Sequence, residues 1–248
     1  MRNAPEPVRI AMWSGPRNIS TAMMRAFENR PDTWVIDEPF YAAFLAATGT
    51  DHPMRAQSMA SQPQDWRVVV EDLLGPVPGG RAIYFQKHMA HHMVDGFGRD
   101  WIASCRNAFL IRAPEAVLAS YVQKRSAVTL DDIGAVTQRE LFERELDRLG
   151  RPPPVVESRD VLADPRAMLT ALCKALGIDF SQSMLRWPAG SRPTDGVWAK
   201  VWYESVERST GFDAPRGDEA SPALPPHLQK IADLARPHYE RLAQFKLA

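Results

Sequence analysis

Residues 8–27 have the sequence VRIAMWSGPRNISTAMMRAF, and this stretch decides the fold. Its first seven residues are mostly apolar and predict a strand, the following Gly-Pro pair predicts a turn, and Ser20 and Thr21 fit the N-cap of a helix. Backbone N–H groups at a helix N-terminus are unpaired and carry partial positive charge, so anions bind there. Arg17 adds a fixed positive charge and a fork of hydrogen-bond donors. The stretch therefore predicts a loop that holds a phosphate-like anion.

The same loop departs from the P-loop signature G-x-x-x-x-G-K-[ST]. It has no second glycine and no lysine before Ser20. In nucleoside triphosphate enzymes this lysine contacts the β- and γ-phosphates. The alternative interpretation is an ordinary strand-to-helix turn with a good cap, and the stretch alone leaves both interpretations open.

The composition is that of a globular protein. The chain has 248 residues, of which 45% are hydrophobic and 24% charged, and this length suits one large α/β domain. Its 30 basic residues balance 30 acidic ones, which argues against nucleic acid or an acidic membrane surface as a partner. Any anion site must therefore be local.

The cysteines and the apolar runs indicate a cytoplasmic location. Cys105 and Cys173 lie within or beside apolar runs and are expected to be buried thiols, with a single disulfide as the alternative. No apolar run approaches the roughly 18 residues of a membrane span. The N-terminus lacks the basic and then apolar pattern of a signal peptide. We therefore expect a cytoplasmic protein.

Apolar strand patterns alternate with helical patterns along the chain. Beyond 8–14, strands are predicted at 33–37, 82–86, 107–112 and 155–157, and helices at 20–29, 40–47, 65–74, 114–124, 129–149, 166–176 and 228–245. This alternation predicts a parallel sheet of about five strands with helices on both faces. Residues 48–64 are expected to form a surface segment or lid. The whole chain is predicted to be one domain, with an α/β core over 8–177 and a loop-rich cap and terminal helix over 178–248.

Charged and polar residues follow the predicted strands. In parallel sheets, ligands bind beyond the carboxyl ends of the strands. The residues expected there are Arg17, Asp37, Glu38, Lys87, His88 and Arg112. Their coincidence at one sheet edge is a stronger signal than any one motif.

Several blocks together resemble the P-loop sulfotransferases, which use 3′-phosphoadenosine 5′-phosphosulfate (PAPS). They are Ser-Gly-Pro-Arg-x-x-Ser-Thr, an acidic residue after the second strand, Phe-Leu-Ile-Arg-Ala-Pro-x-x-x-x-x-Ser and Val-Val-Glu-Ser-Arg-Asp-Val-Leu-x-Asp-Pro. The match covers most of 8–176 in order and weakens beyond Gly177. The resemblance implies a fold like that of the P-loop nucleoside triphosphate hydrolases. It also implies transfer of a sulfuryl group from PAPS to a hydroxyl or amine.

The resemblance also implies which residues hold PAPS. Arg112 and Ser120 have the family spacing of the pair that binds the 3′-phosphate, and Arg208 would add a late contact. The residues implied at the 5′-phosphosulfate are Ser14, Gly15, Arg17, Asn18, Ser20 and Thr21, of which Asn18 together with Ile19 departs from the family pattern.

Two residues compete for the role of general base. Glu38 resembles the glutamate that some branches place after the second strand, with Asp37 as its substitute. His88 resembles a histidine that other branches place after the third strand. Lys87 is expected to stabilise charge on the bridging oxygen. A structural alternative is that Glu38 caps the helix 40–47 or pairs with Arg17.

No metal is expected, since His88, His91 and His92 have no Cys or carboxylate at a recognised ligand spacing.

The acceptor is expected to be a small, partly apolar molecule bound by residues 48–64, 89–98 and 179–226. Trp198, Trp202 and their neighbours Trp187 and Tyr203 would line the acceptor pocket, stack on adenine or pack inside the cap. We expect a monomer or a homodimer. An ATP-dependent kinase and a non-catalytic nucleotide-binding module remain as alternative functions.

Overall fold

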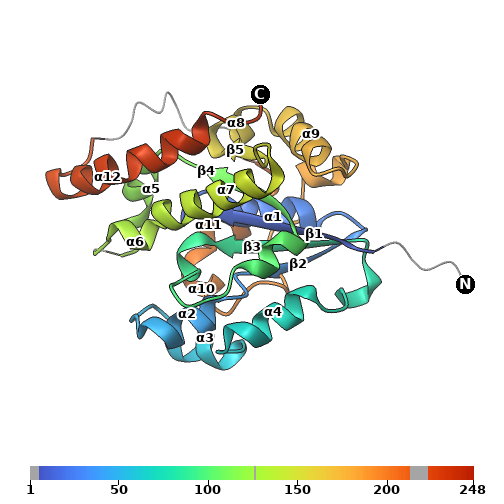
Figure 1. Cartoon of the computed structure of the whole chain (residues 1–248), viewed down its shortest axis with the longest axis horizontal. Helices are drawn as coiled ribbons and strands as arrows, with labels where there is room; N and C mark the ends of the chain where they lie inside the picture. The colour runs from blue at the N-terminus through green and yellow to red at the C-terminus, as the bar shows by residue number, and fades with distance from the viewer. Residues whose placement is uncertain (1–5, 126, 213–222) are drawn as a thin grey trace, which may run out of the picture.

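The sheet is built around β1 (Val8–Ser14), whose side chains are buried from Ile10 onward (Figure 1). β1 pairs in parallel with β3 on one side and β4 on the other, and the strand order is β2-β3-β1-β4-β5. All pairings are parallel. The predicted α/β fold with a five-stranded parallel sheet is thus confirmed. The computed structural model describes residues 6–125, 127–212 and 223–248.

The strands and helices alternate through most of the chain. The other strands are β2 (Thr33–Asp37), β3 (Ile83–Met89), β4 (Arg106–Ile111) and β5 (Val155–Glu157). The helices are α1 (Ser20–Glu28), α2 (Tyr41–Thr48), α3 (Arg55–Ser61), α4 (Trp66–Leu74), α5 (Pro114–Tyr121), α6 (Leu130–Ile133), α7 (Ala135–Leu149), α8 (Ser158–Ala163), α9 (Pro165–Ala175), α10 (Ala199–Trp202), α11 (Glu204–Arg208) and α12 (Pro226–Ala243). No helix in these described ranges is long and apolar enough to cross a membrane.

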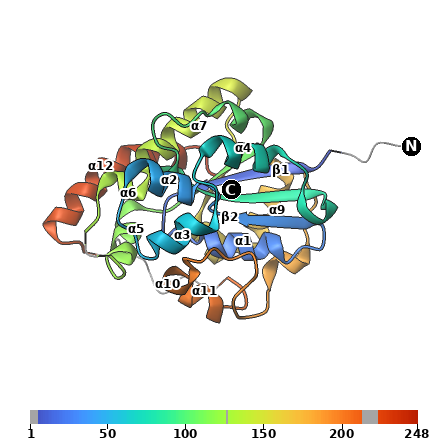
Figure 2. The ribbon, with the colours of Figure 1, turned by 90° about the horizontal axis from the view of Figure 1, so that it is seen from below.

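Helices cover both faces of the sheet. Ile10 and Met12 of β1 pack against α1 and α9, whereas Ala11 and Trp13 face α4, α7 and α12. This alternation follows from the twofold repeat of side-chain direction along a strand. Figure 2 shows α1, α10 and α11 on one side of the sheet and α4 and α7 on the other. The predicted buried thiols, Cys105 and Cys173, are both buried and free.

The third strand is longer than the sequence pattern predicts. Lys87 and His88 were expected after it, but β3 extends to Met89 and contains both. The extension occurs because β3 stays in register with β1, pairing Trp13 with His88 and Ser14 with Met89. Polar residues thus lie inside a fully buried strand.

Several helices differ from the predictions. The expected surface segment 48–64 contains α3, which buries Ser58. The expected single helix over 129–149 is interrupted by Gly134, which has a φ of 67° and separates α6 from α7. Helix α8 was not predicted. The terminal helix α12 is confirmed. Within the region 178–248, residues 213–222 lie outside the described residues. Residues 1–5, before β1, also lie outside them.

The loop between β1 and α1 has an unusual backbone. Arg17 and Ile19 have φ values of 61° and 56°, in the left-handed region that non-glycine residues rarely adopt. Ile19 is the N-cap residue of α1 and no side chain caps the helix, so the predicted capping role of Ser20 and Thr21 is wrong. The first-turn hydroxyls of α1 are therefore available for other partners. Strain of this kind is common at binding sites.

Gly15 is required by close packing. A Cβ atom at this position would lie 2.5 Å from the backbone oxygen of Ile133 in α6. We expect Gly15→Ala to lower the free energy of unfolding by about 3 kcal/mol or more, at the upper end of overpacking effects. Gly80→Ala is the control, because Gly80 has a φ of 60° but open space around it. Its cost should be about 1 kcal/mol, from backbone conformation alone. Equal losses for the two variants in urea unfolding would contradict the packing argument.

Candidate functional site

A cavity of about 410 Å³ lies beyond the carboxyl ends of the parallel strands. The loop after β1 forms one wall, with Arg17, Ser20 and Thr21. Arg112, which follows β4, and Ser120 of α5 lie beside them. The opposite wall includes Glu38 and Lys87 from the ends of β2 and β3, together with Trp198, Trp202 and Tyr203 from the cap segment, which we define as residues 179–212. The cavity therefore lies where open parallel sheets bind ligands.

Three of the predicted donor-binding residues are in direct contact. Arg17 donates from Nε to Ser120 Oγ at 2.9 Å, and Arg112 donates from Nη1 to the backbone oxygen of Arg17 at 2.8 Å. Burial, and then repulsion from Arg112, lowers the pKa of the Arg17 guanidinium below its usual value. Two cations close together in a partly buried wall favour an anion between or beside them.

The other predicted loop residues divide into two groups. Asn18, Ser20 and Thr21 line the cavity. Asn18 donates to the backbone oxygen of Leu110 at 3.2 Å, and its Oδ1 atom is buried without a hydrogen-bond partner in the described structure. Ser14 is fully buried and does not line the cavity, and neither does Gly15. Ser14 and Gly15 therefore belong to the loop but do not form its surface toward the cavity.

Glu38 lies at the opposite wall in a network of buried polar groups. Lys87 donates from Nζ to Asp37 Oδ1 at 2.7 Å, to Glu38 Oε1 at 2.6 Å and to the Tyr203 hydroxyl at 2.7 Å. Tyr203 in turn donates to Asp37 Oδ2 at 2.7 Å. The register of the sheet places Asp37 directly beside Lys87. Two carboxylates, one ammonium group and one phenol thus share a single site.

The environment of Glu38 raises the proton affinity of its carboxylate. Burial raises the pKa of the Glu38 carboxyl, Lys87 opposes this shift and Asp37 adds to it, and the pKa stays above its usual value. Burial alone would lower the pKa of Lys87, but the two carboxylates raise it well above its usual value. Lys87 is therefore charged. Glu38 also has a left-handed backbone, with a φ of 43°. Both features are typical of functional carboxylates.

His88 does not line the cavity within the described structure. Its ring stacks on Trp13 with 4.4 Å between centroids, and its Nε2 atom lies 3.1 Å from Gln86 Oε1. Burial lowers the pKa of His88 to about 3. Neighbouring residues on a strand point to opposite faces, so His88 and Lys87 face different surroundings. The structure therefore gives Glu38, and not His88, access to the cavity.

Arg208 also lies outside the cavity. Its side chain is 70% exposed and pairs with Glu204 one turn earlier at 2.9 Å. Its neighbours Ser209 and Gly211 line the cavity instead. Arg208 was predicted from the family resemblance alone, which did not fix the direction of its side chain.

Tyr41 was not predicted in the cavity, whereas His52, His91 and His92 lie in the ranges expected to bind the acceptor. Tyr41 stacks on His92 with 4.9 Å between ring centroids, and its hydroxyl lies 2.7 Å from His52 Nδ1. Burial lowers the pKa of His52 to about 4 and that of His91 to about 3, so both are neutral near pH 7. These residues make their part of the cavity wall aromatic and uncharged. Across the described residues, no group of three or more His, Cys, Asp or Glu side chains is arranged to hold a metal.

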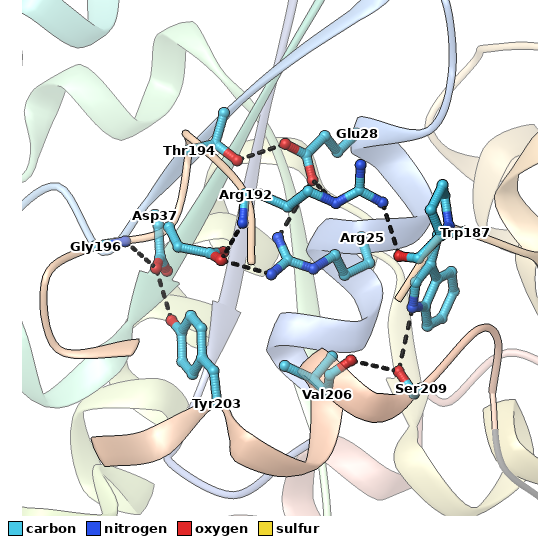
Figure 3. A network of polar contacts seen from close by, with 12 residues as sticks. Arg25, Glu28, Asp37, Trp187, Arg192, Thr194, Gly196, Tyr203, Val206 and Ser209 are labelled. Carbon is cyan, nitrogen blue, oxygen red and sulfur yellow. Dashed lines mark hydrogen bonds and ion pairs between the residues drawn. The ribbon is translucent and has the colours of Figure 1, made fainter. Parts of the chain in front are cut away.

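The cap segment is fastened to the core by buried ion pairs and hydrogen bonds (Figure 3). Arg25 of α1 is only 1% exposed and pairs with Asp195 at 2.7 Å. Thr194 donates to Glu28, and the backbone N–H of Gly196 donates to Asp37 at 3.1 Å. Of the predicted tryptophans, Trp198 and Trp202 line the cavity, and Trp187 packs into the core. The cap segment therefore closes the cavity with fixed geometry.

The family assignment follows from comparison with known proteins. The family described as "Sulfotransferase domain" matches residues 8–241. The chain belongs to this family. The match includes β1, the cavity wall and the cap segment, and it confirms the resemblance that the sequence motifs indicate.

Two proteins of Arabidopsis thaliana are similar in sequence. Branched-chain-amino-acid aminotransferase-like protein 2 is 36% identical to this chain over 207 residues. Branched-chain-amino-acid aminotransferase-like protein 1 is 36% identical to it over 211 residues. The alignments cover 84% and 85% of this chain but 36% and 38% of the relatives. The chain thus spans little more than a third of their length.

Solved sulfotransferase structures share the fold across nearly the whole chain. The sulfotransferase domain of the Synechococcus PCC 7002 olefin synthase has a TM-score of 0.59 and 19% identity, with coverage of 99% of this chain and 98% of that one. The sulfotransferase domain from the curacin biosynthetic pathway has a TM-score of 0.57 and 16% identity, with coverage of 94% and 99%. A sulfotransferase from Alicyclobacillus acidocaldarius has a TM-score of 0.54 and 13% identity, with coverage of 97% and 96%.

The network around Lys87 predicts a large effect on stability. Lys87→Met removes the cation and leaves Asp37 and Glu38 buried without it, so we expect a loss of about 3–5 kcal/mol in the free energy of unfolding. The double variant Lys87→Met, Asp37→Asn removes one of these carboxylates and should recover part of the loss. Urea unfolding at pH 7 measures both. A single variant as stable as wild type, or a double variant with strictly additive losses, would contradict the ion-pair assignment.

Proposed function

We propose that this chain transfers a sulfuryl group from PAPS to the hydroxyl or amine of a small acceptor molecule. One observation carries the proposal: Arg17, Ser120 and Arg112 are in contact at one wall of a cavity that has Glu38 at the other. Such an arrangement provides cations for a phosphorylated donor and a base for the acceptor. Membership of the sulfotransferase domain family supports the same reaction class.

The arginine wall is suited to the donor. Ser20 and Thr21 stand in the first turn of α1, where backbone N–H groups and hydroxyls would bind the 5′-phosphosulfate beside Arg17. Arg112 and Ser120 would bind the 3′-phosphate, as the family spacing implies. The hydrogen bond from Arg17 Nε to Ser120 Oγ joins these two subsites into one surface.

Glu38 is the proposed general base. Its carboxylate takes the proton of the acceptor hydroxyl or amine, the acceptor attacks sulfur in line, and the S–O bond to adenosine 3′,5′-bisphosphate breaks. The leaving phosphate carries the electron pair of that bond and remains beside Arg17. The predicted contact of Lys87 with the bridging oxygen would require it to release Asp37, Glu38 or Tyr203, because all three of its N–H bonds are in use.

The wall around Glu38 favours a small aromatic or partly apolar acceptor. Trp198, Trp202 and Tyr41 supply flat apolar surfaces, and the neighbouring histidines are neutral. A kinase is less well supported, because the loop lacks the lysine that contacts the phosphates of ATP.

Donor binding is the first test. We expect PAPS and adenosine 3′,5′-bisphosphate to raise the melting temperature, and ATP with Mg²⁺ to leave it unchanged. Arg112→Ala should weaken binding of adenosine 3′,5′-bisphosphate by about 10- to 100-fold in calorimetry, the value of a hydrogen bond to a charged group. Adenosine 5′-phosphate is the control, because it lacks the 3′-phosphate and should lose little. Equal losses would mean that Arg112 acts by supporting the loop through the Arg17 carbonyl.

Catalysis by Glu38 is the second test. We expect Glu38→Gln to lower kcat by about 10²- to 10⁴-fold, which is the usual contribution of a general base. Affinity for adenosine 3′,5′-bisphosphate should remain near that of wild type, because Glu38 lies at the opposite wall. Release of this product from PAPS is measured with a panel of phenols, aliphatic alcohols and amines. Unchanged turnover would remove Glu38 from the mechanism.

A further inference from the structure

Asp37, Lys87 and Tyr203 form a group of hydrogen-bonded side chains next to Glu38, separate from the predicted donor loop. Asp37 accepts hydrogen bonds from Lys87 at 2.7 Å, from the Tyr203 hydroxyl at 2.7 Å and from the Gly196 N–H at 3.1 Å. Trp198 donates from Nε1 to the Tyr203 hydroxyl at 3.2 Å. Asp37, Lys87 and Tyr203 are all less than 5% exposed.

The two oxygens of the Glu38 carboxylate differ in their surroundings. Oε1 accepts from Lys87 at 2.6 Å and lies 3.5 Å from the Tyr203 hydroxyl. Oε2 has no hydrogen bond to any residue that the structure describes, and the Glu38 side chain is 12% exposed in the cavity wall. One oxygen is therefore fixed, and the other remains to accept a proton.

We propose that Asp37, Lys87 and Tyr203 are positioning residues for Glu38, and that the cap segment completes the base by supplying Tyr203. The inference rests on the proposed role of Glu38 as general base. Lys87 fixes Oε1, and Tyr203 and Asp37 fix Lys87. Tyr203 belongs to a segment whose Asp195 is paired with Arg25 of α1, so its hydroxyl is held in place by the core.

The network also decides which carboxylate takes the proton. Hydrogen bonds from donors stabilise the charged form of a carboxylate. Asp37 has three close donors, one of which is the single hydroxyl hydrogen of Tyr203, whereas the close donor to Glu38 is Lys87. Asp37 is therefore the carboxylate held by its donors, and Glu38, with one oxygen exposed to the cavity, accepts the proton. Once it does, the buried charges are one carboxylate and one ammonium group, which neutralise each other.

Other titratable side chains around Glu38 are uncharged. Tyr41 of α2 has a pKa well above its usual value, because it is buried and lies near Glu38. Burial lowers the pKa of His92, with a further contribution from the nearby His91. Neither group carries charge near pH 7, so Asp37 and Lys87 are the charges that act on Glu38 at close range, with Tyr203 as a neutral donor.

The test is the titration of the Glu38 carboxyl carbon in the full chain labelled with ¹³C-glutamate. Glu38→Gln identifies the resonance by its loss. Tyr203→Phe removes the hydroxyl that lies 3.5 Å from Glu38 Oε1 and lowers the pKa of Glu38, so its midpoint should move up. Asp37→Asn removes the negative charge that raises this pKa, so the midpoint should move down. Shifts of opposite sign are not expected from loss of packing alone.

Tyr239→Phe is the matched control, because it also removes a tyrosine hydroxyl bonded to a carboxylate in a partly buried setting, that of Glu157 at 2.8 Å. It should leave the Glu38 midpoint unchanged. In turnover, Tyr203→Phe should lower kcat several-fold and leave the KM for PAPS unchanged. A Glu38 midpoint unmoved in Tyr203→Phe, the mildest variant, would overturn the inference. Failure of the proposed function is seen separately, as absence of adenosine 3′,5′-bisphosphate binding to wild type.

Discussion

The site depends on two buried ion pairs, which the ammonium group of Lys87 makes with the carboxylates of Asp37 and Glu38. Removing an ion from water costs several kcal/mol, so a buried cation persists only when its partners are well placed. Here the partners come from the end of β2 and from the cap segment, through Tyr203. The same contacts that neutralise Lys87 therefore join the sheet edge to the segment that closes the cavity.

This dependence explains why the cap segment is anchored to α1. Arg25 and Glu28 project from α1 and bind Asp195 and Thr194 in the cap segment. If that segment moved away, Lys87 would lose the Tyr203 hydroxyl and Asp37 would lose two of its donors. A buried charge without those partners is costly, so the electrostatics of the base and the closure of the cavity are coupled.

The sequence predicted the elements whose physical cause is local. Apolar runs identified the five strands, and the helical pattern at 166–176 identified α9, whose N-cap Asp164 accepts from the Ala167 N–H. Arg17 and Arg112 were predicted at one site because strand ends meet at one sheet edge, the family resemblance added Ser120, and the three residues are in contact. These inferences needed no knowledge of side-chain packing.

The errors arose where distant residues decide the outcome. His88 was interpreted as a polar residue at a strand end, but stacking on Trp13 places it in the interior. Tyr203 reaches Asp37 across 166 positions of sequence, a contact that no local pattern contains. The left-handed backbone at Ile19, which displaces the expected hydroxyl cap, also depends on the surrounding loop and not on the residue type.

The two walls of the cavity have complementary charge, and this suits a transfer reaction. The guanidinium groups of Arg17 and Arg112 lie at the arginine wall. At the other wall, Asp37, Glu38 and Lys87 together carry one excess negative charge when both carboxylates are ionised. In the proposed reaction a proton moves to Glu38 and removes that excess. Negative charge develops at the same time on the leaving phosphate beside the arginines. Both changes occur where the fixed charges of the protein already favour them, so little reorganisation is required during the chemical step.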